Sequence, residues 1–585
     1  MWLAALACGA APSARAQAPA RPPYRTLDDR MVVRRFSSVA EWRERAAWLR
    51  EHVLASAGLL PRPERTPLNP VVFDERKHAD YIVSKVYFES LPGFFVTGNL
   101  YRPVGPGPFP AILSPHGHWT YGRLENTDTA SVPGRAIGLA RLGFVVFSYD
   151  MIGYNDSRQL PHWTPADGDP GSPWGRRESL WGLSLAGLQL WNSIRSLDFL
   201  ESRPEVARDR IGATGASGGG TQVFLLAAVD DRIAASAPVN MISLHMQGGC
   251  LCENLPHLRL DTNNVEIAAL FAPRPMLMVS ASGDWTKETL ELEYPEMRRF
   301  YDLFGAPERV HAIRVDADHN YDRQSREAVY AWMSRWLEGA RAAPSIPETD
   351  FDVDRLPDLL VFHGRALPGG ARSAQGVADG WISAAVRQLA APDQAPLRAA
   401  LLHALGFERQ PAPARARGRR PVVVLASADR ALERAVVGAG FDVRAVRFTP
   451  FDAVAAEKVR HFHTYNRGPA SQRVADLVAA LSAAPGAMLV ADGEAALPGL
   501  LAAAVAAVPV AVLDVDGFDP ASDAAYLERL YVPGLRRAGG LRTAAAMARG
   551  KVVVHNAGQG VPIEGVSAHA RKLSAAEVVR LLKAR

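Results

Sequence analysis

The first part of the chain contains a serine in a setting that suits nucleophilic catalysis. Ser217 lies in the run Gly215–Gly219, which reads GASGG and fits the pattern G-x-S-x-G. A strand that turns sharply into a helix needs small residues around the serine, because larger side chains would clash there. The preceding IGAT and the following TQVFLL fit such a strand and helix. The predicted chemistry is attack of the Ser217 hydroxyl on an acyl carbon, which gives a covalent acyl-enzyme.

An acid and a base follow Ser217 in the chain order that this motif requires. Asp284 comes after a predicted strand at 275–280, and His319 comes after a predicted strand at 311–315. Both therefore lie on loops at strand ends, where a parallel sheet presents its site. His319 would accept the Ser217 proton, and Asp284 would hold the imidazole tautomer and stabilise its cation.

Two alternatives to this interpretation are open. Asp316 and Asp318 compete with Asp284 for the acid role, although they are such close sequence neighbours of His319 that a reach to its ring is less natural. The glycine-rich run could instead be a nucleotide-binding turn. The chain contains no G-x-G-x-x-G or G-x-x-x-x-G-K-[ST] pattern to support that alternative.

An oxyanion hole is predicted in the loop Ser114–Trp119, together with the residue after the nucleophile. We expect the backbone N–H groups of His118 and Gly218 to bind the oxyanion, while His116 and Gly117 shape the turn. The alternative is a metal site at the two histidines, but no convincing carboxylate partner lies nearby in the sequence. The sequence therefore predicts neither a metal nor a cofactor.

Two further loops are candidates for the substrate pocket. The segment 163–181 is rich in tryptophan, whose ring faces suit sugars, and the segment 241–260 interrupts the fold between two strands. The alternative for both loops is packing onto the core. Cys250 and Cys252 lie in the second loop, and we interpret them as small buried thiols. The candidate substrate contacts are His116, Trp119, Trp163, Trp174 and Glu253.

The elements that must position these residues alternate between strand and helix over about residues 80–340. A hairpin is predicted at 81–88 and 94–101, and β-α-β alternation follows it. This order predicts an α/β fold with a mostly parallel sheet and helices on both faces. Further strands are predicted at 111–114, 144–149, 210–214, 233–237, 275–280 and 311–315, and helices at 137–142, 180–202, 219–229, 286–303 and 323–337.

A second, smaller α/β pattern occupies residues 421–585 and contains five predicted strands. The catalytic pattern spans 27–343, and a helical connection with a Pro- and Arg-rich linker spans 344–420. Residues 1–18 combine a short apolar stretch with small residues at alternate positions, which is typical of a signal peptide, although its basic n-region is incomplete. We therefore expect export to the periplasm or the cell exterior.

Composition limits the classes of partner. The chain has 585 residues and a formal net charge of only +5, so no electrostatic argument favours nucleic acid. The apolar stretch near the start is too short to span a bilayer, and we expect no stable membrane insertion. Cys250 and Cys252 are separated by one residue, which excludes a disulfide framework. Oligomeric state has no signature in the sequence.

Five segments resemble the acetyl xylan esterase-like branch of the α/β-hydrolases. They are Ser114–Trp119, Tyr149–Ser157, Ile211–Gln222, Gly248–Pro256 and Asp316–Tyr321. The resemblance covers about 80–340 and implies a carbohydrate esterase with the triad Ser217, Asp284 and His319.

The chain departs from this resemblance in two places. Met151–Tyr154 stands where the best-described xylan deacetylases have Arg-Gly-Gln-Gly, so the acyl group is not fixed by the resemblance. Gly218 follows Ser217, whereas glucuronoyl esterases have a Ser-Arg dipeptide. The region 421–585 is similar to a degenerate copy of the same fold, with Asp492–Ala495 in place of the elbow and no serine there.

The expected function is hydrolysis of acyl esters, acetyl-type esters of a carbohydrate such as xylan, on a small-molecule or polysaccharide substrate. One alternative is a serine peptidase of the oligopeptidase type, although the stretch before Tyr81 is too short for the propeller that such enzymes carry. The other is a non-catalytic carbohydrate-binding or scaffold protein.

Overall fold

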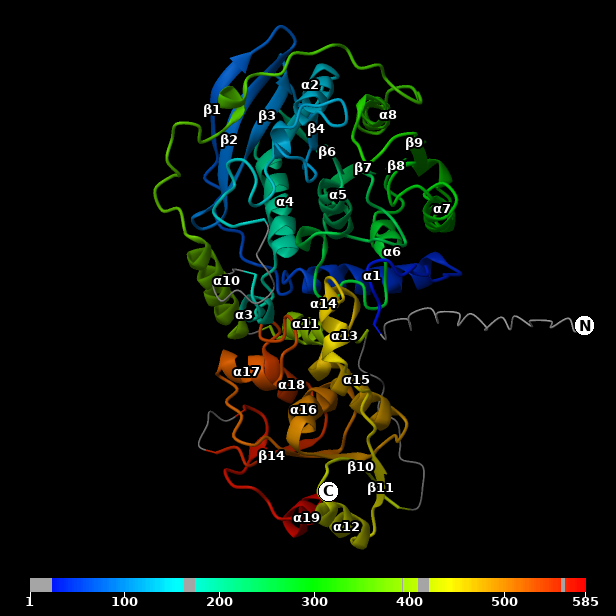
Figure 1. The fold of residues 1–585 in the computed structure, drawn as a ribbon, viewed down its shortest axis with the longest axis vertical. Helices are drawn as coiled ribbons and strands as arrows, with labels where there is room; N and C mark the ends of the chain where they lie inside the picture. Colours follow the sequence, from blue (N-terminus) through cyan, green and yellow to red (C-terminus); the bar gives the residue numbers. More distant parts are fainter. Residues whose placement is uncertain (1–23, 163–173, 392, 409–419, 559–562, 585) are drawn as a thin grey trace, which may run out of the picture.

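The computed structural model describes residues 24–162, 174–391, 393–408, 420–558 and 563–584. The predicted signal segment 1–18 and Trp163 lie outside these residues. Figure 1 shows two lobes, each built around its own sheet, with the C-terminal lobe in yellow to red. No helix in the described ranges combines the length and the apolarity needed to cross a membrane.

The N-terminal lobe contains a mixed nine-stranded sheet in the order β1-β2-β3-β5-β4-β6-β7-β8-β9. The first strands pair antiparallel, and every pair from β5 and β4 onward is parallel. This confirms the predicted α/β class with a mostly parallel sheet. The strands are β1 Val71–Lys77, β2 Tyr81–Leu91, β3 Phe94–Pro103, β4 Phe109–Leu113, β5 Val145–Tyr149, β6 Val206–Ala216, β7 Ile233–Val239, β8 Met276–Ala281 and β9 Val310–Val315.

Helices cover both faces of this sheet. One hydrophobic core contains side chains of α1, α4, α5, α6 and α7, and a second core, on the other face, contains those of α2 and α8. A π-helical turn at Ser334–Glu338 continues α8. The helices are α1 Val39–Ser56, α2 Val132–Arg141, α3 Arg176–Leu180, α4 Leu185–Glu201, α5 Gly218–Val229, α6 Asn264–Ala269, α7 Glu293–Leu303 and α8 Arg323–Met333.

The predicted elements of this lobe are present, and the main differences lie at helix starts. The helix predicted from residue 180 begins at Leu185, because Ser184 caps it by accepting a hydrogen bond from the Gly187 N–H. The helix predicted from residue 286 begins at Glu293, since Thr286 and its neighbours form turns. Helix α1 and strand β1 were not predicted.

The C-terminal lobe contains a parallel six-stranded sheet in the order β11-β10-β12-β13-β14-β15. This is the relative order of the parallel half of the first sheet, β5-β4-β6-β7-β8-β9. The predicted strands are confirmed, and the short β15 is an addition. The strands are β10 Val422–Ala426, β11 Asp442–Ala445, β12 Met488–Ala491, β13 Val510–Asp514, β14 Lys551–His555 and β15 Ser567–Ala568.

The helices of this lobe form their own apolar core with the sheet. The last helix carries the predicted capping box between Ser574 and Glu577. The helices of the connection and the lobe are α9 Leu356–Leu359, α10 Ala374–Leu389, α11 Ala395–Leu405, α12 Arg430–Gly438, α13 Ala453–Glu457, α14 Phe462–Tyr465, α15 Pro469–Ser482, α16 Ala496–Val505, α17 Asp523–Arg529, α18 Gly540–Met547 and α19 Ala575–Lys583.

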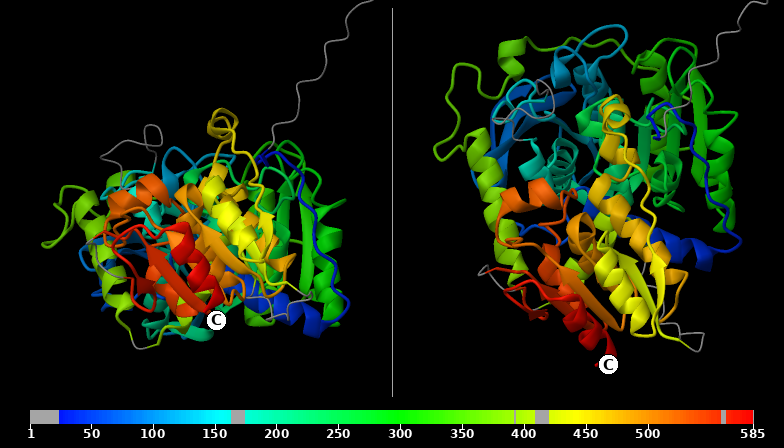
Figure 2. Two further views of the ribbon diagram at one scale, coloured as in Figure 1. Left: turned by 90° about the horizontal axis from the view of Figure 1, so that it is seen from below. Right: turned by 60° about the horizontal axis from the view of Figure 1, so that its bottom comes forward.

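The two lobes are in direct contact. Helix α1 lies where they meet, and α11 packs against it (Figures 1 and 2). The Arg537 side chain donates from Nε to the Gly58 carbonyl oxygen over 3.1 Å. Leu180, at the end of α3, is buried within the core of the C-terminal lobe. The loop that contains α3 therefore connects the two cores.

Candidate active site

Ser217 occupies a strained backbone position between β6 and α5. Its φ and ψ are 57° and −124°, and it forms the N-cap of α5. A residue other than glycine is held at positive φ only where the surrounding structure enforces it, and such strain is frequent at functional sites. The Ser217 N–H donates to the Val239 carbonyl oxygen at the end of β7, over 3.1 Å. The elbow is thereby fixed to the neighbouring strand.

The glycines around Ser217 allow another loop to lie directly on the elbow. A Cβ atom at Gly219 would lie 2.7 Å from the carbonyl oxygens of both Pro115 and His116. A Cβ at Gly218 would lie 2.7 Å from Cε1 of His118. Both distances are too short for real side chains. Glycine at 218 and 219 is therefore required by the approach of the loop after β4 as well as by the turn.

Asp284 and His319 meet at the ends of β8 and β9. Nδ1 of His319 donates to Oδ2 of Asp284 over 2.8 Å. The other oxygen, Oδ1, accepts from the Thr286 N–H at 2.7 Å and from the Thr286 hydroxyl at 2.5 Å. The Asp284 side chain is almost fully buried, whereas that of His319 is 26% exposed. Three donors thus hold the carboxylate. Because Nδ1 of the imidazole donates to it, Nε2 can act as the proton acceptor.

The competing carboxylates have other partners. Oδ1 of Asp316 accepts from the Ser282 hydroxyl over 2.6 Å. Asp318 accepts from the Asn320 side chain through its backbone carbonyl oxygen, so this bond does not involve its carboxylate. Among the described residues, the His319 ring is hydrogen-bonded to neither of these two carboxylates. Of the three acids that the sequence offered, the structure brings Asp284 to His319.

Two chains of contacts connect the His319 loop with the elbow. The Trp119 ring stacks on the His319 ring at 5.8 Å between centroids, and Gly117 lies against Cβ of Ser217. On the other side, the Asn240 side chain, which follows β7, donates to the carbonyl oxygen of Asn320 over 2.9 Å. Because Ser217 bonds to Val239 in the same segment, the nucleophile and the histidine loop share one support.

The loop Ser114–Trp119 is also fixed by the buried side chain of His116. His116 is fully buried; its Nε2 accepts from the Met151 N–H at 2.9 Å, and its Nδ1 lies 2.7 Å from the Gly117 carbonyl oxygen. Burial lowers the pKa of His116 to about 3, so the ring is neutral. His116 was predicted to touch substrate, but both ring nitrogens are engaged with the backbone. It fits the other predicted role, which was to shape the turn.

Two buried arginines, which the sequence reasoning missed, hold the same region. Arg135 donates to the Ser114 hydroxyl at 2.8 Å and to the Pro115 carbonyl oxygen at 3.2 Å. Arg123 forms a buried ion pair with Asp150 at 2.6 Å and a second with Asp156 at 2.8 Å. Both acids lie in the Tyr149–Ser157 segment, whose two carboxylates were the only sequence signal for this anchor.

The predicted oxyanion donors lie beside Ser217. Gly218 is the first residue of α5, so its N–H has no partner within the helix. The His118 ring lies against Gly218. The backbone of His118 belongs to the loop Ser114–Trp119, which packs on Gly218 and Gly219. The Gly218 N–H therefore has the position next to the nucleophile that an oxyanion donor needs.

The remaining candidate substrate contacts are buried or only partly exposed. Glu253 is buried, and its Oε2 accepts from the N–H groups of Gly249 and Cys250 at 2.7 and 3.0 Å. It therefore stabilises its own loop. Nε1 of Trp174 donates to the Pro161 carbonyl oxygen over 3.1 Å, which holds that tryptophan near the start of the loop 163–181. Trp119 is partly exposed next to His319.

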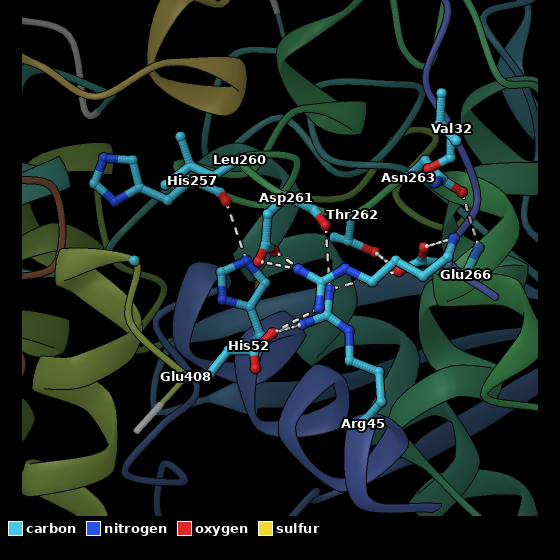
Figure 3. A network of polar contacts seen from close by, with 12 residues as sticks. Val32, Arg45, His52, His257, Leu260, Asp261, Thr262, Asn263, Glu266 and Glu408 are labelled. Carbon is cyan, nitrogen blue, oxygen red and sulfur yellow. Dashed lines mark hydrogen bonds and ion pairs between the residues drawn. The ribbon is translucent and has the colours of Figure 1, made fainter. Parts of the chain in front are cut away.

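A polar network fixes the segment that follows the Cys250 loop to α1 (Figure 3). Arg45 of α1 bonds to the backbone carbonyl of Asp261 at 3.1 Å and lies 3.5 Å from the fully buried Glu266 carboxylate. His52, also on α1, contacts the carbonyl oxygen of His257 at 3.1 Å. The unpredicted helix α1 thus supports the end of the loop 241–260, the predicted wall of the substrate pocket.

The C-terminal lobe contacts this wall as well. The N–H of His257 donates to the carbonyl oxygen of His463 at 2.6 Å, and that of Arg259 donates to Thr464 at 2.9 Å. Arg460 donates from Nη2 to the Gly249 carbonyl oxygen at 2.5 Å. The segment Arg460–Thr464 of the C-terminal lobe therefore touches the loop that carries Cys250 and Cys252.

Comparison with known proteins found a similarity over about half of the chain. No family model matches the chain. Over 298 residues it is 26% identical to "Putative hydrolase YtaP" of Bacillus subtilis (strain 168), covering 47% of this chain and 95% of that protein.

Solved structures of similar fold include three esterases. The methylesterase BT1017 is 34% identical with a TM-score of 0.45, covering 52% of this chain and 66% of its own. A glucuronoyl esterase from Solibacter usitatus is 16% identical with a TM-score of 0.39, and the match covers 54% of this chain and 98% of that one. An acetyl xylan esterase from Paenibacillus sp. R4 is 20% identical with a TM-score of 0.35, and the match covers 53% of this chain and 98% of that one.

Strand order and elbow define the N-terminal lobe as an α/β-hydrolase fold. The chain is distantly related, over 298 residues, to the protein named "Putative hydrolase YtaP".

Proposed function

We propose that the N-terminal lobe hydrolyses carboxylic esters of carbohydrates through an acyl-enzyme on Ser217. The observation that carries the proposal is the strained elbow at Ser217, with the Gly117–His118 backbone against it and an Asp284–His319 pair attached to the same strand ends. A serine hydroxyl, an oriented imidazole and converging N–H groups are the parts that acyl transfer needs.

In the proposed mechanism the ester carbonyl binds with its oxygen toward the N–H groups of Gly218 and His118. Nε2 of His319 accepts the Ser217 proton as Oγ attacks the carbonyl carbon, and Asp284 stabilises the resulting imidazolium. The alcohol leaves with the proton from His319. Water then attacks the acyl-enzyme, with His319 as base again, and releases the acid and free Ser217.

The first experiment compares wild type with Ser217→Ala on p-nitrophenyl acetate, acetylated xylan and a peptide amide. We expect ester hydrolysis by wild type alone, with a loss of at least about 10³-fold in the variant. Activity on the amide in place of the esters would favour the peptidase alternative. Absence of activity on all three substrates, or full ester activity of Ser217→Ala, would contradict the proposal.

The acyl group needs a separate panel, because the proteins named in the comparison act on different esters. Acetyl esters, uronic acid methyl esters and glucuronoyl esters should be offered at matched concentrations. The resemblance of the five segments favours acetyl esters of xylan. A kcat/KM that is higher for methyl or glucuronoyl esters would change the assigned substrate and leave the Ser217 mechanism in place.

We also propose that the C-terminal lobe is a degenerate hydrolase-like domain without chemistry of its own. Its sheet has the order of the parallel half of the first sheet, but Asp492–Ala495 follows β12 where Ser217 follows β6. Substituting Asp492 by Asn should leave ester hydrolysis unchanged. A loss of turnover in that variant, with the fold intact, would show that this turn takes part in the reaction.

Export is proposed from the segment 1–18 alone. Expression of the full chain with its natural start in a Gram-negative host, followed by intact-mass measurement of the periplasmic fraction, tests it. A mature chain that begins after residue 18 supports export, and an unprocessed cytoplasmic chain contradicts it.

A further inference from the structure

Four metal-ligating side chains come together beside the elbow. They are His118, His162, Cys250 and Cys252, whose ligand atoms all lie within 4.8 Å of one another. They come from three separate loops, after β4, after β5 and after β7. Cys250, Cys252 and His162 are buried, and the His118 side chain is 19% exposed.

The imidazole of His162 is oriented as a ligand would be. Its Nδ1 lies 2.7 Å from the carbonyl oxygen of Ile152, which can only accept a hydrogen bond, so the proton is on Nδ1. The lone pair of Nε2 therefore faces the cluster, 3.5 Å from Sγ of Cys250. A backbone carbonyl that fixes the tautomer in this way is a common outer partner of metal-bound histidine.

His118 has a corresponding arrangement on the other side of the cluster. Its Nε2 lies 3.0 Å from Sγ of Cys252, and its Nδ1 lies 3.9 Å from Oε1 of the buried Glu253. A carboxylate behind the distal nitrogen is again the usual second partner of a histidine ligand. The two imidazoles and two thiols thus point their ligand atoms at a common centre.

We propose that these four side chains bind one Zn²⁺ in a closed Cys₂His₂ site. Two sulfur and two nitrogen ligands in tetrahedral arrangement suit zinc better than other abundant divalent metals. With bonds of about 2.0–2.3 Å, the ligand atoms would lie about 3.3–3.8 Å apart, so side-chain shifts of about 1 Å complete the geometry. Four protein ligands leave no open position, so the ion is structural.

This metal would clamp the proposed oxyanion loop. His118 supplies both the side chain that binds zinc and the backbone N–H predicted to bind the oxyanion. Cys250 lies next to Gly249, whose carbonyl oxygen Arg460 of the C-terminal lobe contacts. Zinc would therefore tie the proposed oxyanion loop to the loop that the second lobe supports. The site itself does not depend on the proposed ester hydrolysis.

A metal-free alternative is a thiolate–imidazolium pair. Nε2 of His118 lies 3.0 Å from Sγ of Cys252, which is within reach of a charge-assisted hydrogen bond. The same contacts would then hold the loops by a charged hydrogen bond, without zinc. This alternative is one outcome of the experiment.

The experiment measures zinc by elemental mass spectrometry in the full chain, produced with zinc and dialysed free of unbound metal. We expect about one zinc per wild-type chain, and a fall of at least about fivefold in Cys252→Ser and His162→Gln. His311→Gln, which changes an exposed histidine of β9, is the matched control and should keep the metal. Ser217→Ala should also keep it, which separates this proposal from the catalytic one.

A second measurement keeps the proposal testable if the variants do not fold. Wild-type chain stripped with a chelator and loaded with Co²⁺ should show the visible and near-ultraviolet absorption of tetrahedral cobalt with thiolate ligands, and Zn²⁺ should displace it. A folded wild-type chain without bound zinc and without that cobalt spectrum would overturn the proposal in favour of the thiolate–imidazolium pair. Zinc that remains in both Cys252→Ser and His162→Gln would also overturn it.

Discussion

Nδ1 of His319 donates a hydrogen bond to Oδ2 of Asp284 over 2.8 Å, although the two residues lie on different strands' loops. The bond sets the imidazole tautomer, because Nδ1 carries the proton and Nε2 remains a base. The carboxylate can hold this role only if it stays oriented and charged. Two of the predictions below concern that orientation, and the others concern the scaffold around it.

Asp284→Asn should abolish most of the activity without unfolding the protein. An amide at this position favours the wrong tautomer of His319, and the expected loss in kcat is about 10⁴-fold. Steady-state kinetics on p-nitrophenyl acetate would measure it. Asp316→Asn is the matched control, since Asp316 bonds to the Ser282 hydroxyl instead of the ring. An equal loss in the control would move the acid role to Asp316.

Thr286→Val should lower kcat by about tenfold and leave KM nearly unchanged. Its hydroxyl donates to Asp284 and accepts from the Ala281 N–H, and a hydrogen bond to a charged group contributes about 1.5–3 kcal/mol. Loss of this donor lets the Asp284 carboxylate turn, which weakens its hold on the His319 ring. Thr289→Val is the control, because its buried hydroxyl has no partner among the described residues. An unchanged kcat in Thr286→Val, or an equal fall of kcat in the control, would refute the positioning role.

Gly219→Ala should destabilise the fold and inactivate the site. The added Cβ would lie 2.7 Å from two backbone oxygens of the loop after β4, and overpacking of this kind costs about 1–3 kcal/mol. Chemical denaturation would measure the free energy of unfolding. Gly438→Ala, at the end of α12 with nothing within 4 Å of its Cβ, should be neutral or slightly stabilising. Wild-type activity and stability in Gly219→Ala would contradict the close approach of the two loops.

Arg123→Met should reduce the free energy of unfolding by about 3–5 kcal/mol, because it leaves the buried Asp150 carboxylate without its counter-ion. The Tyr149–Ser157 segment, which bonds to His116, should loosen at the same time. Urea unfolding gives the first effect and kcat/KM the second. Arg298→Met breaks a half-exposed pair with Asp302 and should cost less than about 1 kcal/mol. Similar costs for the two variants would exclude a special role for the buried pair.

Stability should fall as the pH is lowered, in part through His52. Burial, the first cause, and the nearby His403 lower the pKa of His52 to about 3, whereas an unfolded histidine titrates near 6.5. Between about pH 6.5 and pH 3 the unfolded chain binds a proton that folded His52 does not, so stability falls by up to about 1.4 kcal/mol per pH unit.

His52→Gln should reduce this slope, measured as the free energy of unfolding between pH 7 and acidic pH within that window. His363→Gln, at an exposed position of the connection, should leave the slope unchanged. The prediction fails if both variants have the wild-type slope, because folded His52 would then take up its proton like the unfolded chain.

Local patterns were enough to predict most of the first lobe. The alternation of apolar strands and helices predicted the parallel half of the sheet, and the GASGG run predicted the turn at Ser217. Asp284 and His319 could be placed on neighbouring loops because parallel strands end at one edge. Helix α1 was missed, although it caps at Ser38 and supports the wall of the site. Its contacts with Asp261 and Glu266 join residues more than 200 positions apart, and no local pattern encodes such a pairing.

The sequence by itself determined the kind of fold, the elbow and the order of the three proposed triad residues, because strand period, small residues at a turn and chain order are local properties. The tertiary structure decided which acid reaches His319, since orientation of a side chain depends on Thr286 and on the packing of two loops. It also decided that His162 joins the two cysteines and His118. Three loops meet there only because β4, β5 and β7 end at the same edge of the sheet, and proximity of this kind is set by the folded sheet as a whole.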